Sequence, residues 1–149
     1  METRQTGWLI SAVFVMAILF FGGLIVWSGI PPDESWILWF ITPLMLIPLL
    51  LFYRLVVKTD QTEIRISFGI GLIRKSWKIA DIESVKVVRN NFLHGWGIHH
   101  TLSTSIYNIS GFDAIEISFK GRKRLVRIGT NEPEKLAGYL KGLLHKSRK

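Results

Sequence analysis

The chain has 149 residues, no cysteine, 19 Lys and Arg, 11 Asp and Glu, and a net charge of +8. The absence of cysteine excludes a disulfide framework, a thiolate metal site and a cysteine nucleophile. The positive charge is concentrated in residues 58–149, where 17 basic and 8 acidic side chains leave a net charge of +9, whereas residues 5–32 carry no charged side chain.

Two long apolar segments come first in the chain, at residues 7–30 and 36–57. About 20 apolar residues in a helix cross the hydrocarbon core of a membrane, and aromatic side chains favour its two interfaces. Aromatic residues lie near the ends of both segments: Trp8, Trp27, Trp36, Trp39 and Tyr53. The connector holds two prolines and two acids, which favour a turn in water. Residues 1–57 are therefore predicted to form a transmembrane helical hairpin.

Two alternatives for these segments are disfavoured. A secretory signal peptide has an apolar core of about 7–15 residues, whereas the first segment here is longer and a second follows at once. Two buried helices of a soluble bundle would need a partner surface, but the rest of the chain alternates like strands. Pro43 and Pro48 are expected to bend the second helix. Neither segment has an ionisable residue at its middle, which disfavours ion or proton transport.

The basic residues that flank the segments predict their orientation, because cytoplasmic flanks are enriched in Lys and Arg. Arg4 flanks one end of the predicted hairpin, and Arg54 and Lys58 flank the other, whereas the connector carries Asp33 and Glu34. A multi-pass protein of the cell (inner) membrane is predicted, with both termini in the cytoplasm.

Residues 58–149 are predicted to form one soluble domain built mainly from strands. Ile64, Ile66 and Phe68 alternate with polar residues, which is typical of a half-buried strand. A turn at Gly69–Gly71 leads into a second strand. Later strands are expected at 85–89, after a glycine-flanked turn at His94–Ile98, and at 106–109, 114–119 and 124–128. About seven short antiparallel strands result.

An amphipathic helix is predicted after Gly129. Thr130 or Asn131 can cap it, and Pro133 is tolerated in its first turn. Apolar residues follow at helical spacing: Leu136, Tyr139, Leu140, Leu143 and Leu144. A short sheet with one covering helix favours a bent sandwich or an open barrel that the helix closes at one end.

Four segments of the domain carry a resemblance: Trp77–Val85, Gly95–Ile98, Tyr107–Ile117 and Arg127–Leu136. They resemble the bacterial pleckstrin-homology-like domains, and most closely the short members with two membrane spans before the domain. The resemblance implies an α+β fold, a bent antiparallel sandwich of about seven strands with one C-terminal helix. It also implies a non-catalytic binding module that often forms homo-oligomers.

Basic side chains on two hairpins are the main candidates for binding. The resemblance assigns lipid head-group contact to the first hairpin, and so to Arg74, Lys75 and Lys78. A second basic patch lies on a later hairpin: Lys120, Arg122, Lys123, Arg124 and Arg127. The alternative is non-specific attraction to an anionic leaflet, to which each cation near the surface contributes about 1 kcal/mol. Non-specific attraction is the favoured interpretation, and a specific lipid site stays open as the alternative.

No metal site, cofactor or catalytic site is predicted. His99 and His100 are adjacent and so face opposite sides of a strand, and with His94 they lack a nearby acid, since residues 85–112 contain no Asp or Glu. A zinc site needs three or four ligands. Nucleic acid is disfavoured as a partner, because Trp77 and Trp96 are more useful as core residues than as stacking platforms.

The expected function is that of a membrane-anchored, self-associating binding or scaffold protein that is not an enzyme. Its expected partners are the bilayer and its anionic lipids, a second copy of the chain and other membrane proteins. A specific anionic-lipid sensor is the alternative, and a membrane-bound enzyme is the least favoured one.

Overall fold

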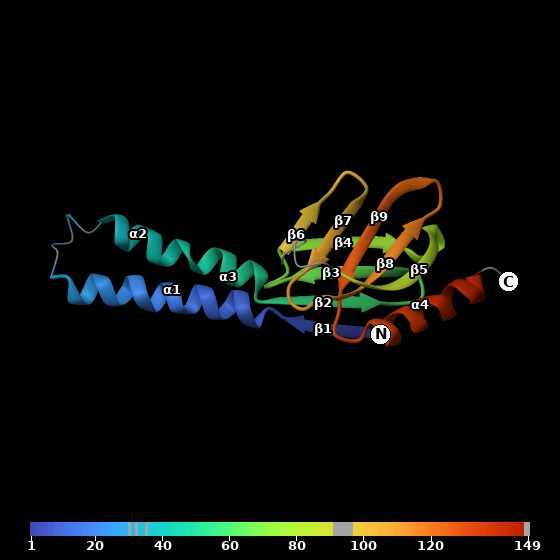
Figure 1. Ribbon diagram of the computed structural model, residues 1–149, viewed down its shortest axis with the longest axis horizontal. Helices are drawn as coiled ribbons and strands as arrows, with labels where there is room; N and C mark the ends of the chain where they lie inside the picture. Colours follow the sequence, from blue (N-terminus) through green and yellow to red (C-terminus); the bar gives the residue numbers. More distant parts are fainter. Residues whose placement is uncertain (30, 32, 35, 91–96, 148–149) are drawn as a thin grey trace.

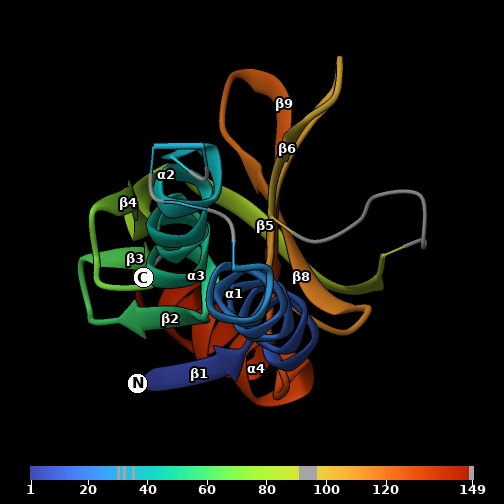
Figure 2. The same cartoon turned by 90° about the vertical axis from the view of Figure 1, so that its left-hand side faces the viewer.

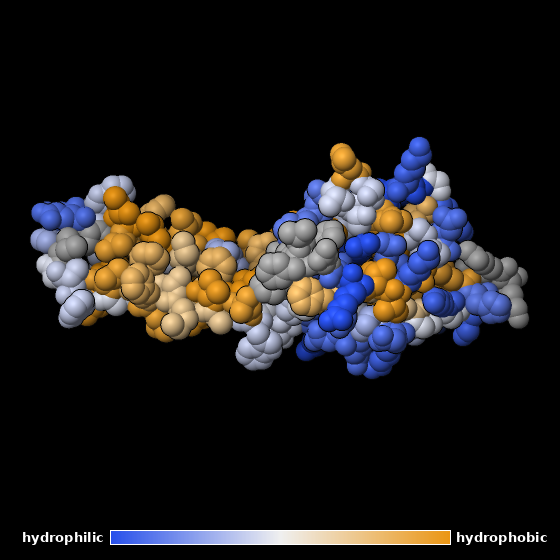
Figure 3. All heavy atoms as spheres, viewed as in Figure 1, coloured by the Kyte–Doolittle hydropathy of each residue, from blue (hydrophilic) through white to orange (hydrophobic). Residues whose placement is uncertain are grey.

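The computed structural model describes residues 1–29, 31, 33–34, 36–90 and 97–147, so the interpretation of His94–Trp96 lies outside the described residues. A helical hairpin extends from one end of a sheet-rich body, and both termini lie on that body (Figure 1). The body has two sheets and a C-terminal helix, which confirms the α+β class. Apolar side chains cover the helices, whereas polar and charged ones dominate the body (Figure 3).

The helix α1 (Trp8–Trp27) has 20 residues, none of them charged and none of them buried. It is the one helix among the described residues that is long and apolar enough to cross a membrane. The second apolar segment is shorter and consists of α2 (Trp36–Leu44) and α3 (Leu46–Phe52). The helix breaks at Met45 because Pro48 has no N–H for the carbonyl of Leu44 and its ring clashes there.

The first sheet contains four antiparallel strands in sequential order. They are β1 (Glu2–Thr6), β2 (Arg54–Thr59), β3 (Glu63–Phe68) and β4 (Ile73–Lys78). The helices are thus inserted between two neighbouring strands, and Thr6 and Arg54 are register partners. The prediction of a helix over 36–57 was wrong at its end, since residues 54–57 are in β2. The expected domain start at Lys58 falls inside this strand.

The second sheet has five strands in the order β5-β8-β9-β7-β6. They are β5 (Ile82–Arg89), β6 (Gly97–His100), β7 (Thr104–Asn108), β8 (Asp113–Phe119) and β9 (Arg122–Gly129). A 3-10 turn, Ile79–Asp81, joins the two sheets. The prediction of an all-antiparallel set was wrong for β7 and β9, which run parallel. In the sheet, β9 lies between β8 and β7. It runs antiparallel to β8, the strand that precedes it in the chain, and therefore in the same direction as β7.

The core lies between the sheets and is closed by α4 (Pro133–Ser147), which packs on β5 and β8. Seen from the helical end, the two sheets lie side by side with α4 below them (Figure 2). The predicted inward residues of β3 are at most 1% exposed. Leu136 and Leu140 are fully buried, whereas Tyr139 is 37% exposed and lies outside the apolar face. The hydroxyl of Thr130 accepts a hydrogen bond from the amide of Glu132 at 3.2 Å, near the start of α4.

The body is joined to the end of α3 through the turn between β3 and β4. The amide of Ile70 donates to the carbonyl of Leu50 at 3.1 Å, and the amide of Gly69 donates to the carbonyl of Arg54 at 2.8 Å. Gly69 has a φ of +50°, and a Cβ there would lie 1.9 Å from the Leu50 oxygen. Only glycine therefore allows the turn to approach the helix this closely.

A buried polar network ties β1 to the second sheet. The side-chain amide of Gln5 donates to the carbonyl of Ser110 and accepts from the amide of Ile109 at 3.4 Å. The Thr130 hydroxyl lies 3.4 Å from the hydroxyl of Thr3, the other inward residue of β1. These contacts satisfy polar groups that would otherwise be costly to bury.

Candidate functional site: a basic hollow beside the helices

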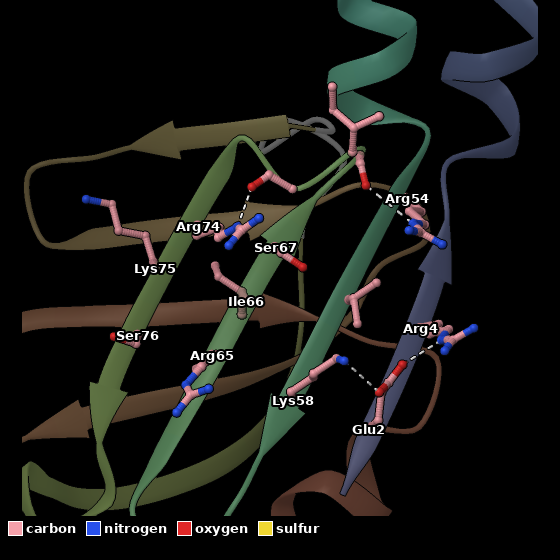
Figure 4. A pocket seen from close by; sticks show the side chains of 14 residues that line it. Glu2, Arg4, Arg54, Lys58, Arg65, Ile66, Ser67, Arg74, Lys75 and Ser76 are labelled. Carbon is pink, nitrogen blue, oxygen red and sulfur yellow. Dashed lines mark hydrogen bonds and ion pairs between the residues drawn. The ribbon is translucent and has the colours of Figure 1, made fainter.

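An open hollow of about 560 Å³ lies on the outer face of the first sheet, next to the end of the helical hairpin (Figure 4). All four strands of that sheet contribute cations to its lining. We call it the basic hollow, after the six cations that line it: Arg4, Arg54, Lys58, Arg65, Arg74 and Lys75. One acid, Glu2, lies among them.

Strand pairing brings most of these side chains to one face. Successive residues of a strand point to opposite sides of the sheet, so the buried Leu55, Val57 and Ile66 leave their neighbours facing out. Arg4 pairs with Val56, which pairs with Ser67, which pairs with Arg74, so one row crosses the whole sheet. The next row contains Glu2, Lys58, Arg65 and Ser76.

Three of the six cations have acidic partners. Glu2 lies 2.7 Å from Arg4 and 3.2 Å from Lys58, and hydrogen bonds first from Arg4 and then from Lys58 lower the pKa of Glu2. Arg65 pairs with Glu63, and that hydrogen bond raises the pKa of Arg65. These pairs reduce the positive charge around Arg4, Lys58 and Arg65.

The three remaining cations have no acidic partner among the described residues, and two of them are held by the glycine turn. Arg54 Nε donates to the carbonyl of Gly69 at 3.3 Å, and Arg74 Nε donates to the carbonyl of Gly71. The guanidinium group of Arg54 also lies 5.2 Å from the ring centre of Tyr53. Because Nε makes these bonds, the two Nη groups of each arginine remain to bind an anion. Paired Nη donors match the oxygens of a phosphate group.

The structure distributes the three predicted head-group residues unequally. Arg74 and Lys75 line the basic hollow, although Lys75 extends outward from the edge strand β4 (Figure 4). Lys78 does not line it: it lies four residues beyond Arg74 along β4, a distance of about 13 Å, at the far end of the strand, where its register partner is Glu63. The assignment of lipid contact to these residues stays a prediction.

The second predicted patch is not a single cluster of free charges. Arg127 Nε lies 2.8 Å from Glu116 Oε2 in a half-buried ion pair between β8 and β9. Arg124 donates to the carbonyl of Thr101 at 2.9 Å, and Lys120 donates to that of Ala80 at 2.8 Å. Arg122 lies 5.8 Å above the ring of Phe119. The hairpin that carries these residues belongs to the other sheet (Figure 1).

Four residues of the basic hollow were not among the sequence-based candidates: Arg4, Arg54, Lys58 and Arg65. In the sequence, Arg4, Arg54 and Lys58 stand out only as the basic flanks of the apolar segments. The alternation around Ile64 did place Arg65 on an outward face. To place Lys58 beside it, one would have to recognise 54–59 as the strand that pairs with 63–68.

Side chains that could support other chemistry do not converge in the described part of the chain. His100 Nδ1 lies 3.1 Å from Ser105 Oγ, but Ser105 is only 6% exposed on a central stretch of strand. No group of three His, Asp or Glu residues among those described could hold a metal ion.

The basic hollow is therefore the feature best suited to a ligand, and its chemistry is that of an anion receptor. Comparison with known proteins adds nothing to this geometry: no family model, no curated protein and no solved structure matches the chain.

Proposed function

We propose that this protein is a non-catalytic, membrane-anchored binding module whose basic hollow holds the phosphate groups of anionic lipids in the leaflet from which its helices emerge. The observation that carries the proposal is the position of the hollow. Six cations line it, and the turn at its rim is hydrogen-bonded to the last turn of α3. A lipid phosphate at the membrane surface would lie at the level of the three cations that lack an acidic partner.

Strand pairing supports two crossings of the membrane. The length and composition of α1 suit one crossing. The chain that contains α1 leaves the first sheet at Thr6 and returns to it at Arg54, and these two residues are direct partners. If α1 crosses, the segment Trp36–Phe52 must therefore cross back. Both termini then lie on the side of the body, and the basic flanks favour the cytoplasm of the cell (inner) membrane.

The pleckstrin-homology-like description of the body is part of the proposal. Two sheets and a closing C-terminal helix support it, as does the position of Arg74 and Lys75, on the β3–β4 hairpin, in the lining of the candidate site. The described residues form nine strands where about seven were predicted, so β1 and β2 are additional, and the parallel pair of β7 and β9 is a second departure from that pattern.

Native mass spectrometry of the full chain, released from detergent with added lipids, tests the binding. The wild type should keep phosphatidylglycerol and lose phosphatidylcholine. Each cation near an anionic surface contributes about 1 kcal/mol, or about fivefold in affinity. The variant Arg54→Gln/Arg74→Gln/Lys75→Gln removes three cations and should therefore bind phosphatidylglycerol about a hundredfold more weakly.

A matched variant controls for net charge. Lys120→Gln/Arg122→Gln/Lys123→Gln removes three charges from the other hairpin and should leave lipid binding unchanged. Equal losses in both variants would show general attraction to the whole basic body in place of a site. Retention of phosphatidylglycerol by the first variant would contradict the proposal.

Self-association is a second proposal, and the free edges of the first sheet support it. Among the described strands, β1 and β4 end that sheet, so each presents an outer row of backbone groups that a second copy could pair with. The same mass spectra report the number of chains. A dimer or larger assembly under mild conditions is expected, and a strict monomer would contradict the idea.

A further inference from the structure

The turn between β3 and β4 exposes two large apolar side chains beside the helices. Ile70 is 52% exposed and Leu72 is 74% exposed. We call these two residues the apolar tip. They follow Phe68, whose ring packs 5.9 Å from that of Phe52 at the end of α3. Phe68 itself is buried, and the amide of Ile70 donates to the carbonyl of Leu50, so the tip lies beside the last turn of α3.

Three amides and two carbonyls of this turn make hydrogen bonds within the protein. The amides of Gly69, Ile70 and Gly71 donate to the carbonyls of Arg54, Leu50 and Phe68 at 2.8, 3.1 and 2.7 Å. The carbonyls of Gly69 and Gly71 accept from the two arginines of the basic hollow. A segment in lipid must satisfy its backbone groups internally, and these bonds do so for five groups of the turn.

Helix length gives a second reason for lipid contact here. At 1.5 Å per residue, the 20 residues of α1 span about 30 Å, whereas the 17 residues of Trp36–Phe52 span about 26 Å. When a helix is shorter than the hydrocarbon core, the residues next to one of its ends also lie within the apolar layer of the membrane. The apolar tip adds apolar side chains at the end of the shorter span, where its last turn meets the body.

We propose that the apolar tip inserts into the leaflet from which the helices emerge and forms a third attachment of the body to the membrane. The inference rests on the membrane anchoring in the proposed function. Ile70 and Leu72 lie in the outer hydrocarbon region, and Arg54 and Arg74 lie beside them at the level of the phosphates. The insertion fixes the tilt of the body, so that the basic hollow faces the lipid surface.

Single cysteines in the full chain test this, because the natural chain has none. Nitroxide labels are attached at Leu72→Cys, at Ile70→Cys, and at two reference sites. Leu19→Cys in the middle of α1 reports lipid, and Leu102→Cys, a leucine fully exposed on the turn between β6 and β7, reports water. The protein is placed in vesicles of phosphatidylcholine and phosphatidylglycerol, and collisions with oxygen and with a water-soluble nickel complex are compared.

The labels at 70 and 72 should collide more often with oxygen than with nickel, at a depth between those of positions 19 and 102. If position 19 is in lipid but 70 and 72 match 102, the inference is overturned and the anchoring stands. If position 19 itself is in water, the anchoring fails and the inference fails with it.

Discussion

Two glycines control how closely separate parts of the chain approach. Gly69 meets the end of α3, and Gly129 meets the buried polar network, where a Cβ would lie 2.1 Å from Asn108 Oδ1 and 3.0 Å from Gln5 Oε1. At both positions the neighbour is a polar group with defined hydrogen bonds, so a methyl group cannot be accommodated without breaking them.

Gly129→Ala should lower the free energy of unfolding by about 1–3 kcal/mol, because overpacking displaces Asn108 and Gln5. Thermal unfolding of the full chain in detergent measures this. Gly138→Ala is the matched control: nothing lies within 4 Å of a Cβ on that exposed position of α4, so alanine should stabilise the helix by up to about 1 kcal/mol. Equal effects at both sites would argue against the network.

Gly69→Ala should weaken the junction of helix and sheet more than the body as a whole. A left-handed φ costs a non-glycine residue about 1–2 kcal/mol, and the Cβ also clashes with the Leu50 carbonyl. Hydrogen exchange should therefore speed up at the amide of Ile70 and at the end of α3, while β8 and β9 keep their protection. Unchanged exchange at Ile70 would show that the turn does not hold the helix.

Asp60 makes stability depend on pH in the acid range. Hydrogen bonds from the Thr62 hydroxyl, and then from the amides of Thr62 and Glu63, lower its pKa from 3.8 to about 2. A lowered pKa in the folded state means stability that is present above pH 3.8 and is lost as the pH falls toward 2. Asp60→Ala should reduce the loss of unfolding free energy between pH 3.8 and about 2, and Thr62→Val, which removes one of the three hydrogen bonds, should reduce it in part. Identical pH profiles for all three proteins would contradict the assignment.

At the scale of elements, strong apolar alternation decided what could be predicted. β3, β8 and α4 were predicted because buried and exposed residues alternate with the period of a strand or a helix. β1 could not be predicted because its inward residues, Thr3 and Gln5, are polar. The start of β2 could not be predicted because Leu55, Val56 and Val57 continue the apolar run of the preceding helix.

The candidate site, too, could be predicted only where its residues are close together in the sequence. Arg74 and Lys75 could be predicted because they lie on a hairpin that is local in sequence. Arg4 and Arg54 are separated by the whole helical hairpin, and only the pairing of β1 with β2 brings them to one face. Long-range pairing leaves no mark in a short window of sequence.

The helical hairpin should be replaceable by a short turn. Since Thr6 and Arg54 are partners, residues 1–6 joined to residues 54–147 by a few Gly and Asn residues should fold as a β-hairpin within the first sheet. Dispersed amide signals and cooperative unfolding would confirm it. The fragment 58–149 lacks β1 and most of β2, so it should not fold, and a well-folded 58–149 would contradict the assigned role of these strands.

At the scale of the whole molecule, the main feature is that both ends of the helical insertion meet one sheet, at Thr6 and Arg54. In the proposed function, the apolar helices, the basic hollow and the apolar tip act at the same membrane surface. The charge of residues 58–149 would support that arrangement, since an anionic leaflet attracts a basic body most strongly within a Debye length.

The most direct test is the labelling of single cysteines in sealed cells by a membrane-impermeant maleimide. Asp33→Cys lies in the turn between α1 and α2, and Lys141→Cys lies on α4 of the body. If both helices cross the membrane and the body lies in the cytoplasm, position 33 reacts from outside and position 141 reacts only after the membrane is opened. Reaction of position 141 in sealed cells, or recovery of the intact chain in the soluble fraction, would contradict this arrangement.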